Sequence, residues 1–343
     1  MANDTEDPGA RAGEGGASRV LITGGSSGLG LAMATALAEA GVSVALTSRS
    51  GERARAAAAG LPGAIGLELD ARDEPSVTRA VDEAETRLGG IDMLVNNAGI
   101  GMRTVNPGFL SEPQGFWNVS PDGFRGVIET NLTGYFLVAR EVTPRMLAAG
   151  HGRIVNISMN HSTMNRAGFV PYGPSRAGAE ALSRIMAADL RGTGVSVNML
   201  LPGGATRTGM VPPGAPHRAL LDPAIMGPPV VWLASAKAGG VHDERLVATE
   251  FGDWLRRRRL TGLSGVGVNL YDQGHAGTER RCPRPCRRRR PVGPGQRPPV
   301  RCGAWPLGAS RRRAQGARGL SQCGARPARG ASGCGAHPAR GPG

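Results

Sequence analysis

Short apolar runs alternate with longer amphipathic segments between residues 19 and 255. The apolar runs predict seven strands, near residues 20–23, 43–47, 64–68, 93–96, 153–158, 196–200 and 244–248. Segments with apolar residues at helical spacing lie between them and predict helices, for instance over residues 28–40, 76–88, 121–148 and 175–191. This alternation predicts an α/β fold with a doubly wound parallel sheet, in which ligands bind at the carboxyl ends of the strands.

Basic residues are concentrated at one end of the chain, whose 343 residues carry a formal net charge of +14. Residues 1–255 hold 20 Arg, one Lys and 25 acidic residues, a net charge of −4, whereas residues 256–343 hold 20 Arg and two acidic residues, a net charge of +18. The second segment is also poor in the large apolar residues that offset the entropy lost on folding. We therefore expect a disordered N-terminus at 1–17, a single folded domain at 18–255 and a disordered basic tail at 256–343.

Three interpretations of this tail stay open. Gly, Arg, Pro and Ala are the residues that GC-rich codons encode, so the first interpretation is that the tail is the product of a shifted reading frame. The second is that it is an inert linker. The third is that it is an arm that binds nucleic acid through the arginine runs at 256–259, 287–290 and 311–313. The absence of an RNA-binding module, and the presence of only Trp305 and Tyr271 to stack on bases, argue against the arm.

The cysteines and histidines indicate no metal site and no disulfide framework. All five cysteines lie in the tail, so the body needs no oxidising compartment. Cys282 and Cys286 have no second pair of Cys or His to complete a zinc site. The chain has no run of 18 apolar residues and no apolar signal segment at its start, so we expect a soluble cytoplasmic protein without a membrane partner.

The first predicted strand leads into a glycine-rich turn at the start of the first predicted helix. Glycines let the backbone approach a pyrophosphate closely, and unpaired N–H groups at a helix start favour its negative charge. A glycine run alone also suits a plain flexible turn, but its position between strand and helix favours dinucleotide binding in a Rossmann fold. The expected contacts are Gly24, Ser26, Ser27, Gly28, Leu29 and Gly30.

The spacing Thr23-Gly24-x-x-x-Gly28-x-Gly30 resembles the TGxxxGxG turn of the short-chain dehydrogenase/reductase family. Further motifs similar to those of the family follow in order: Asn96-Asn97-Ala98-Gly99, a helical Asn131, Tyr172 four residues before a basic residue, and Asn198 to Gly203. The resemblance covers residues 18–255. It implies an oxidoreductase that interconverts a ketone or aldehyde with an alcohol by hydride transfer, and a homodimer or homotetramer formed through helices 121–148 and 175–191. It also implies cofactor contacts at Asn97, Ala98, Gly99, Pro202 and Gly203.

The resemblance assigns catalytic roles to a small group of residues. Tyr172 matches the proton donor of the family, and Asn131 matches the asparagine that supports its proton relay. The residue four positions after the tyrosine is Arg176, where the family has lysine. Arginine stays cationic, so it can assist Tyr172 electrostatically and bind the nicotinamide ribose, but it cannot release a proton to a relay. Tyr172 and Arg176 are both expected to contact the cofactor.

The sequence does not decide which residue polarises the substrate carbonyl. The serine of the family usually lies 13 residues before the tyrosine, and Met159 stands there. Ser158 is the first candidate, although adjacent strand residues point to opposite faces, so it needs a local rearrangement to act in place of residue 159. Ser162, Thr163 or Asn160 is the second alternative, and no replacement at all is the third. The irregular lysine and serine positions motivate a second hypothesis, a cofactor-binding sensor or scaffold with little or no turnover.

The end of the second predicted strand favours NADP(H) over NAD(H). An acid there accepts the ribose hydroxyls of NAD and repels the 2′-phosphate of NADP. This chain has Ser48, followed by Arg49 with a guanidinium suited to a phosphate, although Arg49 is also explained as a solvated arginine. Asp70 resembles the adenine-contacting acid of the family, or else caps the helix that starts near Pro75.

Two longer loops, at 101–120 and 206–229, hold apolar residues. These residues either pack locally or line a pocket for a fairly apolar carbonyl or alcohol substrate.

Overall fold

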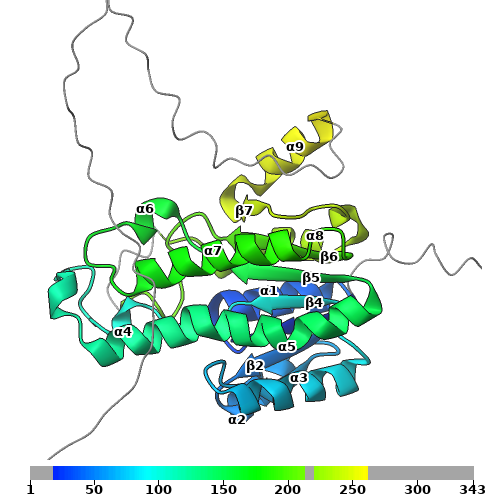
Figure 1. Ribbon diagram of the computed structural model, residues 1–343, viewed down its shortest axis with the longest axis horizontal. Coiled ribbons are helices and arrows are strands. Elements are labelled where there is room, and N and C mark those ends of the chain that lie inside the picture. The colour runs from blue at the N-terminus through cyan, green and yellow to red at the C-terminus, as the bar shows by residue number, and fades with distance from the viewer. Residues whose placement is uncertain (1–17, 213–219, 262–343) are drawn as a thin grey trace, which may run out of the picture. The chain divides into compact units, whose positions relative to one another are not determined.

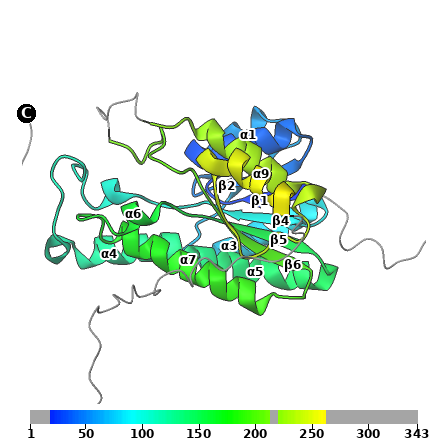
Figure 2. The same ribbon diagram turned by 90° about the horizontal axis from the view of Figure 1, so that it is seen from above.

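The computed structural model describes residues 18–212 and 220–261. Within them, seven parallel strands form one sheet in the order β3-β2-β1-β4-β5-β6-β7, with helices on both faces (Figure 1 and Figure 2). The strands are β1 (Arg19–Ile22), β2 (Ser43–Ser48), β3 (Ile65–Glu68), β4 (Met93–Asn96), β5 (Gly152–Ile157), β6 (Val195–Leu201) and β7 (Arg245–Val247). The doubly wound Rossmann fold predicted from the sequence is confirmed, and each predicted strand lies within a residue of its expected ends.

Alternate residues of the central strands face two separate cores. Val20 and Ile22 of β1 pack against one set of helices, whereas Leu21 packs against the other. The first set is α1 (Gly28–Glu39), α2 (Gly51–Ala59) and α8 (Gly227–Ala234), and the second is α3 (Glu74–Leu88), α5 (Gly134–Ala149) and α7 (Tyr172–Asp189). Because both faces are buried, the strands appear in the sequence as continuous apolar runs.

The winding of the sheet reverses between β1 and β4. β1 pairs with β2 on one side and with β4 on the other, so the loops that follow β1 and β4 run in opposite directions. Such a reversal opens a crevice at the carboxyl ends of the two strands. The glycine-rich turn follows β1 and the Asn97-Ala98-Gly99 segment follows β4, so both predicted cofactor segments meet at this crevice.

The helix predicted over 121–148 is interrupted in the structure. Helix α4 (Pro121–Ile128) passes into a π-helical turn (Glu129–Thr133), and α5 follows. The turn carries Asn131 inward, where its Oδ1 accepts from the Ile100 N–H at 2.8 Å and its Nδ2 donates to the Ile100 carbonyl at 2.9 Å. These bonds to a distant loop stabilise a wider turn, which apolar spacing along the helix does not reveal.

Helix α9 (Phe251–Thr261) runs through Leu255, where the sequence analysis placed the end of the folded domain. Phe251 and Trp254 pack on Trp232 of α8, with ring centroids 5.9 and 5.2 Å apart. The start of the arginine-rich tail therefore continues a helix that aromatic side chains hold. The predictions made for residues 1–17 and for the tail beyond residue 261 lie outside the described residues.

Shorter helices complete the described fold. They are α6 (His161–Met164) and the 3-10 turns Met102–Thr104, Phe116–Asn118, Pro223–Met226, Ala236–Ala238 and Ala248–Glu250. None of the helices in the described ranges is long and apolar enough to cross a membrane.

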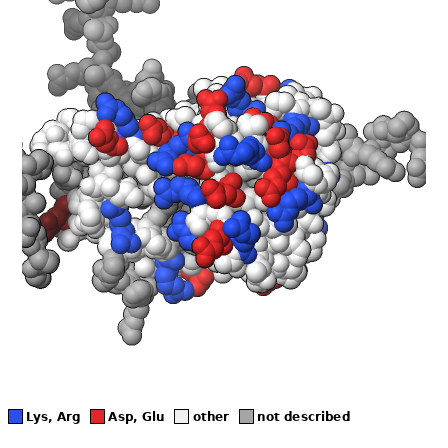
Figure 3. Space-filling view, turned by 90° about the horizontal axis from the view of Figure 1, so that it is seen from below, with Lys and Arg blue, Asp and Glu red and all other residues white. Residues whose placement is uncertain are grey.

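Acidic and basic side chains are interleaved on the side of the molecule where α2 and α3 lie, as Figure 3 shows. Arg145 of α5, for example, pairs with Asp82 and Glu85 of α3 and with Glu141 of its own helix. Both signs of charge therefore lie side by side on this face of the described domain.

Asp92 ties the start of β1 to the start of β4. Its Oδ2 accepts from the backbone N–H groups of Ser18 and Arg19, each at 3.0 Å, and from the Ser18 hydroxyl. The Arg19 guanidinium and the His151 ring contact the same carboxylate. Burial alone would raise the pKa of Asp92, but the hydrogen bonds from Arg19 and Ser18 outweigh it and hold that pKa well below its usual range.

We expect Asp92→Asn to lower the free energy of unfolding at neutral pH by about 2 kcal/mol, because it removes a nearly buried hydrogen-bonded charge. A carboxyl whose folded-state pKa is depressed stabilises the fold above its ordinary value of about 4, and that stabilisation is lost as pH falls below it. The wild-type chain should therefore lose more stability between pH 5 and 3 than the variant. Urea unfolding across this pH range measures the difference.

Asp122→Asn is the matched control, because the Asp122 side chain is 94% exposed. Equal pH slopes for the wild type and Asp92→Asn would contradict this account of Asp92.

Candidate active site

Hydrogen bonds join the glycine-rich turn to the end of β4. The Thr23 hydroxyl accepts from the backbone N–H groups of Asn97 and Ala98, each at 3.0 Å. The Asn97 side chain donates in return to the carbonyls of Thr23 and Gly24, at 3.0 and 3.1 Å. Asn97 and Ala98 thus fix the shape of the turn, which is a role the motif alone did not specify.

The turn leaves no room for larger residues at two glycines. Gly24 has a φ of +64°, and a Cβ there would lie 2.9 Å from the Ala98 Cα. A Cβ at Gly30 would clash with the Gly24 carbonyl oxygen. Close packing of this kind brings the backbone of the turn near the crevice, as a bound pyrophosphate requires.

The start of α1 is open to an anion. Ser27 occupies the N-cap position without a side-chain capping bond, and the first turn of α1 contains no acidic residue. Among the described residues, the N-cap side chain does not bond to the N–H groups at this helix start, which carry the positive end of the helix dipole. Ser26, Gly28 and Leu29 lie in the same turn, so the residues present fit the diphosphate of a dinucleotide.

The predicted adenosine end lies at the carboxyl ends of β2 and β3. Ser48 is buried at the end of β2, and its hydroxyl accepts from the Ser50 N–H at 3.3 Å, whereas Arg49 is exposed. Asp70 follows β3 and holds Arg72 through two side-chain hydrogen bonds of 2.9 and 2.6 Å. Those bonds outweigh partial burial and lower the pKa of Asp70.

The capping role considered for Asp70 belongs to Asp73 instead. The Asp73 side chain accepts from the Ser76 N–H and is the N-cap of α3. Asp70 therefore has no capping role, and the charge of the nearby Arg49 also acts on it.

Tyr172 and Arg176 lie one turn apart at the start of α7. The helix begins at Tyr172, three residues before the predicted start at Ser175. The Arg176 guanidinium carbon lies 5.4 Å from the centre of the Tyr172 ring, and the Tyr172 hydroxyl lies 3.9 Å from the Met210 sulfur. The phenol and the cation predicted to work together are therefore in contact, at the carboxyl end of β5.

Arg176 is buried, with 3% of its surface exposed. Its Nη1 donates to the Tyr135 hydroxyl at 2.6 Å and to the Ile157 carbonyl at 3.0 Å, and its guanidinium also lies against the Tyr135 ring. Burial lowers the pKa of Arg176, but the phenols of Tyr135 and Tyr172 raise it by more, so it stays above its ordinary value. The side chain is a permanent cation within this site.

One nitrogen of this cation has no partner. The Nε of Arg176 is buried and makes no hydrogen bond within the described part of the chain. A buried unpaired donor on a cation costs free energy unless another group completes it. The donor is suited to a ribose hydroxyl of a nicotinamide nucleotide, so Arg176 fits such a cofactor.

Asn131 is fully buried and uses its whole side-chain amide in structural hydrogen bonds. Beyond its two bonds to Ile100, its Nδ2 donates to the Ser175 hydroxyl at 3.1 Å. The side chain therefore connects the π-helical turn, the loop after β4 and the start of α7. This arrangement supports the site by holding three segments together, rather than through a free amide.

Ser158, the first candidate for the substrate carbonyl, is hydrogen-bonded to another side chain. The Ser158 hydroxyl donates to the Glu180 carboxylate, which also accepts from Arg245 at 2.8 Å and pairs with His161 at 3.0 Å. Burial alone would raise the pKa of Glu180, but the hydrogen bonds from Ser158 and Arg245 outweigh it and lower that pKa. Met159, on the opposite side of the strand end, packs with Tyr172 against one small apolar cluster. Strand alternation explains this result, because a one-residue shift reverses the direction of the side chain.

The alternatives to Ser158 as the residue that polarises the carbonyl are Asn160, Ser162 and Thr163. The Asn160 side chain donates to the Gly203 carbonyl at 2.9 Å, which ties this loop to the turn after β6. Ser162 is exposed and Thr163 is half-buried, both on α6. No hydrogen bond joins any of these three side chains to Tyr172 among the described residues. Met159 packs against the same apolar cluster as Tyr172, and the Tyr172 hydroxyl itself lies near the Met210 sulfur.

Two loops form the walls above Tyr172. The apolar cluster beside it consists of Met102, Phe109 and Phe169, with Phe109 and Phe169 edge to face at 5.6 Å. Arg103 donates to the Gly209 carbonyl at 2.6 Å and so joins the loop after β4 to the loop after β6. The segment after β6 contains Pro202 and Gly203 at its start, and its Thr208 lies against Gly28 of the glycine-rich turn.

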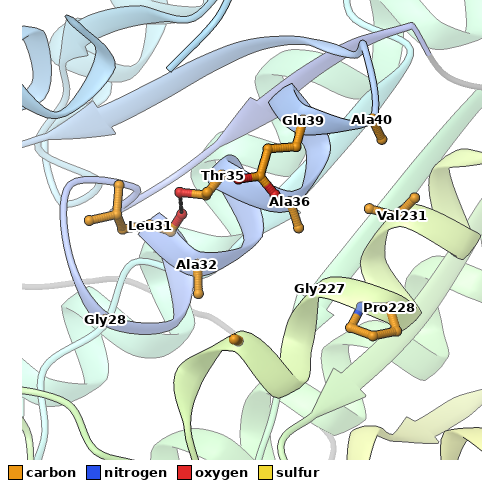
Figure 4. Close-up of a pocket in the computed structure, with 11 residues that line it drawn as sticks. Gly28, Leu31, Ala32, Thr35, Ala36, Glu39, Ala40, Gly227, Pro228 and Val231 are labelled. Carbon is orange, nitrogen blue, oxygen red and sulfur yellow. Dashed lines mark hydrogen bonds between the residues drawn. The ribbon is translucent and has the colours of Figure 1, made fainter. Parts of the chain in front are cut away.

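A separate open hollow of about 720 Å³ lies between α1 and α8 (Figure 4). Its walls are mostly apolar and small, and neither Tyr172 nor Arg176 lines it. The residues that line it include Gly28, Ala32, Ala36, Gly227, Pro228 and Val231. The hollow is thus distinct from the candidate active site, which it adjoins only at Gly28.

Sequence reasoning missed Tyr135 and Glu180. Tyr135 lies four residues after Asn131, a spacing that puts two residues on one helix face and could have associated it with the site. Glu180 lies eight residues after Tyr172 on the same helix, but nothing in its spacing indicates that it binds Ser158. Met210 lies in the 206–229 loop, which the sequence analysis gave as a possible pocket wall, and its sulfur lies near the Tyr172 hydroxyl.

Comparison with known proteins agrees with this geometry. A family model described as short chain dehydrogenase matches residues 18–218. The 2-dehydro-3-deoxy-L-rhamnonate dehydrogenase (NAD(+)) of a Sphingomonas species is 33% identical over 183 residues, which make up 53% of this chain and 70% of that protein.

Two solved structures share the fold. The 3-ketoacyl-(acyl-carrier-protein) reductase of Brucella melitensis, complexed with NADH, has a TM-score of 0.60 at 25% identity and covers 67% of this chain and 96% of its own. The gluconate 5-dehydrogenase of Burkholderia cenocepacia, in complex with NADP and tartrate, has a TM-score of 0.59 at 31% identity and covers 68% of this chain and 95% of its own.

We expect Gly99→Ala to disrupt this site. A Cβ at Gly99 would clash with the Arg176 Nη2 and lie 3.1 Å from the Asn131 Oδ1, so the guanidinium must move. Overpacking of this kind costs about 1–3 kcal/mol, and displacement of Arg176 should weaken dinucleotide binding by about tenfold or more. Calorimetric titration with nicotinamide dinucleotides measures the binding, and thermal unfolding measures the stability.

Gly126→Ala in α4 is the control, because an added Cβ there meets no atom within 4 Å beyond its chain neighbours and the nearby backbone of its own helix. It should leave binding unchanged. Unchanged binding in both variants would show that Arg176 does not need the space beside Gly99.

Proposed function

Because the chain belongs to the short-chain dehydrogenase/reductase family, we propose that it is an NADP(H)-dependent oxidoreductase that interconverts a ketone or aldehyde with an alcohol. The relatives are named dehydrogenases and reductases, which favours turnover over the sensor or scaffold hypothesis. One observation carries the assignment to this site. A buried permanent cation, Arg176, lies against the Tyr172 phenol and keeps an unpaired donor.

Tyr172 would exchange the proton of the reaction. The bound nicotinamide supplies or accepts the hydride at the carbonyl carbon. In reduction, the Tyr172 hydroxyl gives its proton to the carbonyl oxygen, and the resulting phenolate lies beside the Arg176 guanidinium. In alcohol oxidation the same phenolate takes the proton back. Arg176 stabilises the charge throughout but passes no proton, because it does not titrate.

Met159 leaves the carbonyl oxygen with one hydrogen-bond donor from this part of the site. A thioether cannot donate, and the Ser158 hydroxyl is held by Glu180. The substrate oxygen would therefore depend on Tyr172 for both orientation and protonation. The apolar cluster of Met102, Phe109 and Phe169 beside the phenol supports a fairly apolar substrate.

The preference for NADP(H) rests on the end of β2. Solved relatives contain NADH or NADP, so family membership does not choose between them. In this chain Ser48 supplies no carboxylate to bind the ribose hydroxyls of NAD, and the exposed Arg49 can pair with a 2′-phosphate.

A homo-oligomer is part of the same proposal. Phe136 and Leu147 of α5 and Ile185 of α7 are 44%, 43% and 59% exposed, and both helices cover the same face of the sheet. Exposed apolar side chains on neighbouring helices support burial of this face against a second copy of the chain.

We expect NADP⁺ to bind the full chain at least about tenfold more tightly than NAD⁺, the scale of a charged hydrogen bond to phosphate. Arg49→Asp should reverse the order, because the carboxylate repels the phosphate and accepts the ribose hydroxyls. Calorimetric titration of both proteins with both nucleotides gives the four dissociation constants.

Arg191→Asp makes the same charge change at the far end of α7 and should leave the NADP⁺/NAD⁺ ratio as it is. Tighter binding of NAD⁺ by the unmodified chain would refute the NADP(H) preference while leaving the oxidoreductase proposal intact.

Met159→Ser should raise kcat for reduction of a ketone by about tenfold, because it places a hydroxyl donor at a position that packs, as Tyr172 does, against the apolar cluster of the site. The oxidation of NADPH in the presence of a panel of ketones measures the rate.

In parallel, Ser158→Ala should keep the activity within about threefold, since Ser158 bonds to Glu180 rather than to substrate. A loss of two orders of magnitude in Ser158→Ala would return the catalytic role to Ser158.

A further inference from the structure

Arg176 is placed in the interior without a carboxylate to neutralise it. Of the residues described, those that it contacts are neutral: Nη1 donates to the Tyr135 hydroxyl and to the Ile157 carbonyl, and the rings of Tyr135 and Tyr172 flank the guanidinium carbon at 5.4 Å each. A buried ion is tolerated only when well-oriented polar groups replace its water. Tyr135 therefore supplies a large share of the environment that makes an arginine acceptable here.

Tyr135 is itself held rigidly. It is 1% exposed on α5, directly after the π-helical turn, and its hydroxyl donates to the Ile157 carbonyl at 3.2 Å while accepting from Arg176. The phenol thus connects strand β5 to the guanidinium. Burial raises the pKa of Tyr135 and outweighs the opposing effect of Arg176, so the group is a neutral hydroxyl that can accept from the cation.

These bonds fix the orientation of the guanidinium. Its Nη1 is satisfied by Tyr135 and Ile157, its Nη2 lies against Gly99 at the end of β4, and its Nε is unpaired. Because the guanidinium is planar and rigid, securing one nitrogen determines where the other two face. A lysine ammonium is a compact group with three rotatable donors and has no such requirement.

We propose that Tyr135 is a positioning residue, which acts through Arg176 by fixing the plane of the guanidinium, whereas a lysine ammonium at the same place would not depend on this hydroxyl for its orientation. The inference rests on the proposed function, since the unpaired Nε of Arg176 matters only if it meets the cofactor. Tyr135 and Arg176 form a matched pair. Loss of the Tyr135 hydroxyl should harm the enzyme when residue 176 is arginine and should matter little when it is lysine.

The test uses four full-length proteins: the wild type, Tyr135→Phe, Arg176→Lys and the double variant. Tyr135→Phe keeps the ring but removes the acceptor of Nη1, so we expect about tenfold or more weaker NADP⁺ binding and a matching rise in the KM for NADPH. In the lysine background the same change should alter both quantities by less than about threefold. Calorimetric titration with NADP⁺ and initial rates with NADPH and a ketone supply the two readouts.

A purely structural role for Tyr135 gives a different result. It would lower the unfolding temperature equally in both backgrounds and leave the dissociation constant and KM unchanged below that temperature. Thr143→Val is the control, since it removes another hydroxyl from α5, one that donates to the Ala139 carbonyl within the helix. It should leave NADP⁺ binding at the wild-type value.

The outcomes separate the inference from the function it rests on. Absence of dinucleotide binding in the wild type would remove the proposed function and the inference with it. Wild-type binding and turnover, together with equal effects of Tyr135→Phe in both backgrounds, would overturn the inference alone. If Tyr135→Phe does not fold, recovery of a folded, nucleotide-binding protein by adding Arg176→Lys supports the pairing, and failure of the double variant to fold contradicts it.

Discussion

A permanent charge inside the fold, with no carboxylate among its contacts, is the constraint around which this site is arranged. A guanidinium cannot lose its proton to escape the cost of burial, so neighbouring groups must replace the water that it gives up. For Arg176 those groups are the Ile157 carbonyl, the Tyr135 hydroxyl and two aromatic rings. They come from β5, α5 and α7, while Gly99 after β4 leaves room for the side chain. Four segments of the crevice are thereby held in one relative position.

The sheet could be predicted from the sequence because strands buried on both faces appear as apolar runs, and their ends are marked by glycine and polar residues. The π-helical turn could not be predicted, because it depends on bonds between Asn131 and Ile100, which are 31 residues apart. Helix α9 was missed for a different reason. The arginine composition after Leu255 indicated a tail, whereas the aromatic side chains of Phe251 and Trp254 hold the helix on α8.

The site was predictable where a motif fixes spacing on one element, and unpredictable where partners come from distant ones. Tyr172 and Arg176 are adjacent because four residues make about one helical turn. The place of Ser158 depends on Glu180, 22 residues further along, and alternation along the strand was the only warning in the sequence. Tyr135 looks like an ordinary core residue until the partner of its hydroxyl is known.

The thioether of Met159, which packs on the same apolar cluster as Tyr172, has a consequence for substrate electronics. In the proposed reaction a single donor contacts the substrate carbonyl oxygen, so the protein polarises the carbonyl less than a site with two donors would. The substrate must supply the remainder through its own substituents. Discrimination at this centre would then follow the inductive strength of groups beside the carbonyl more closely than it would in a site with two donors.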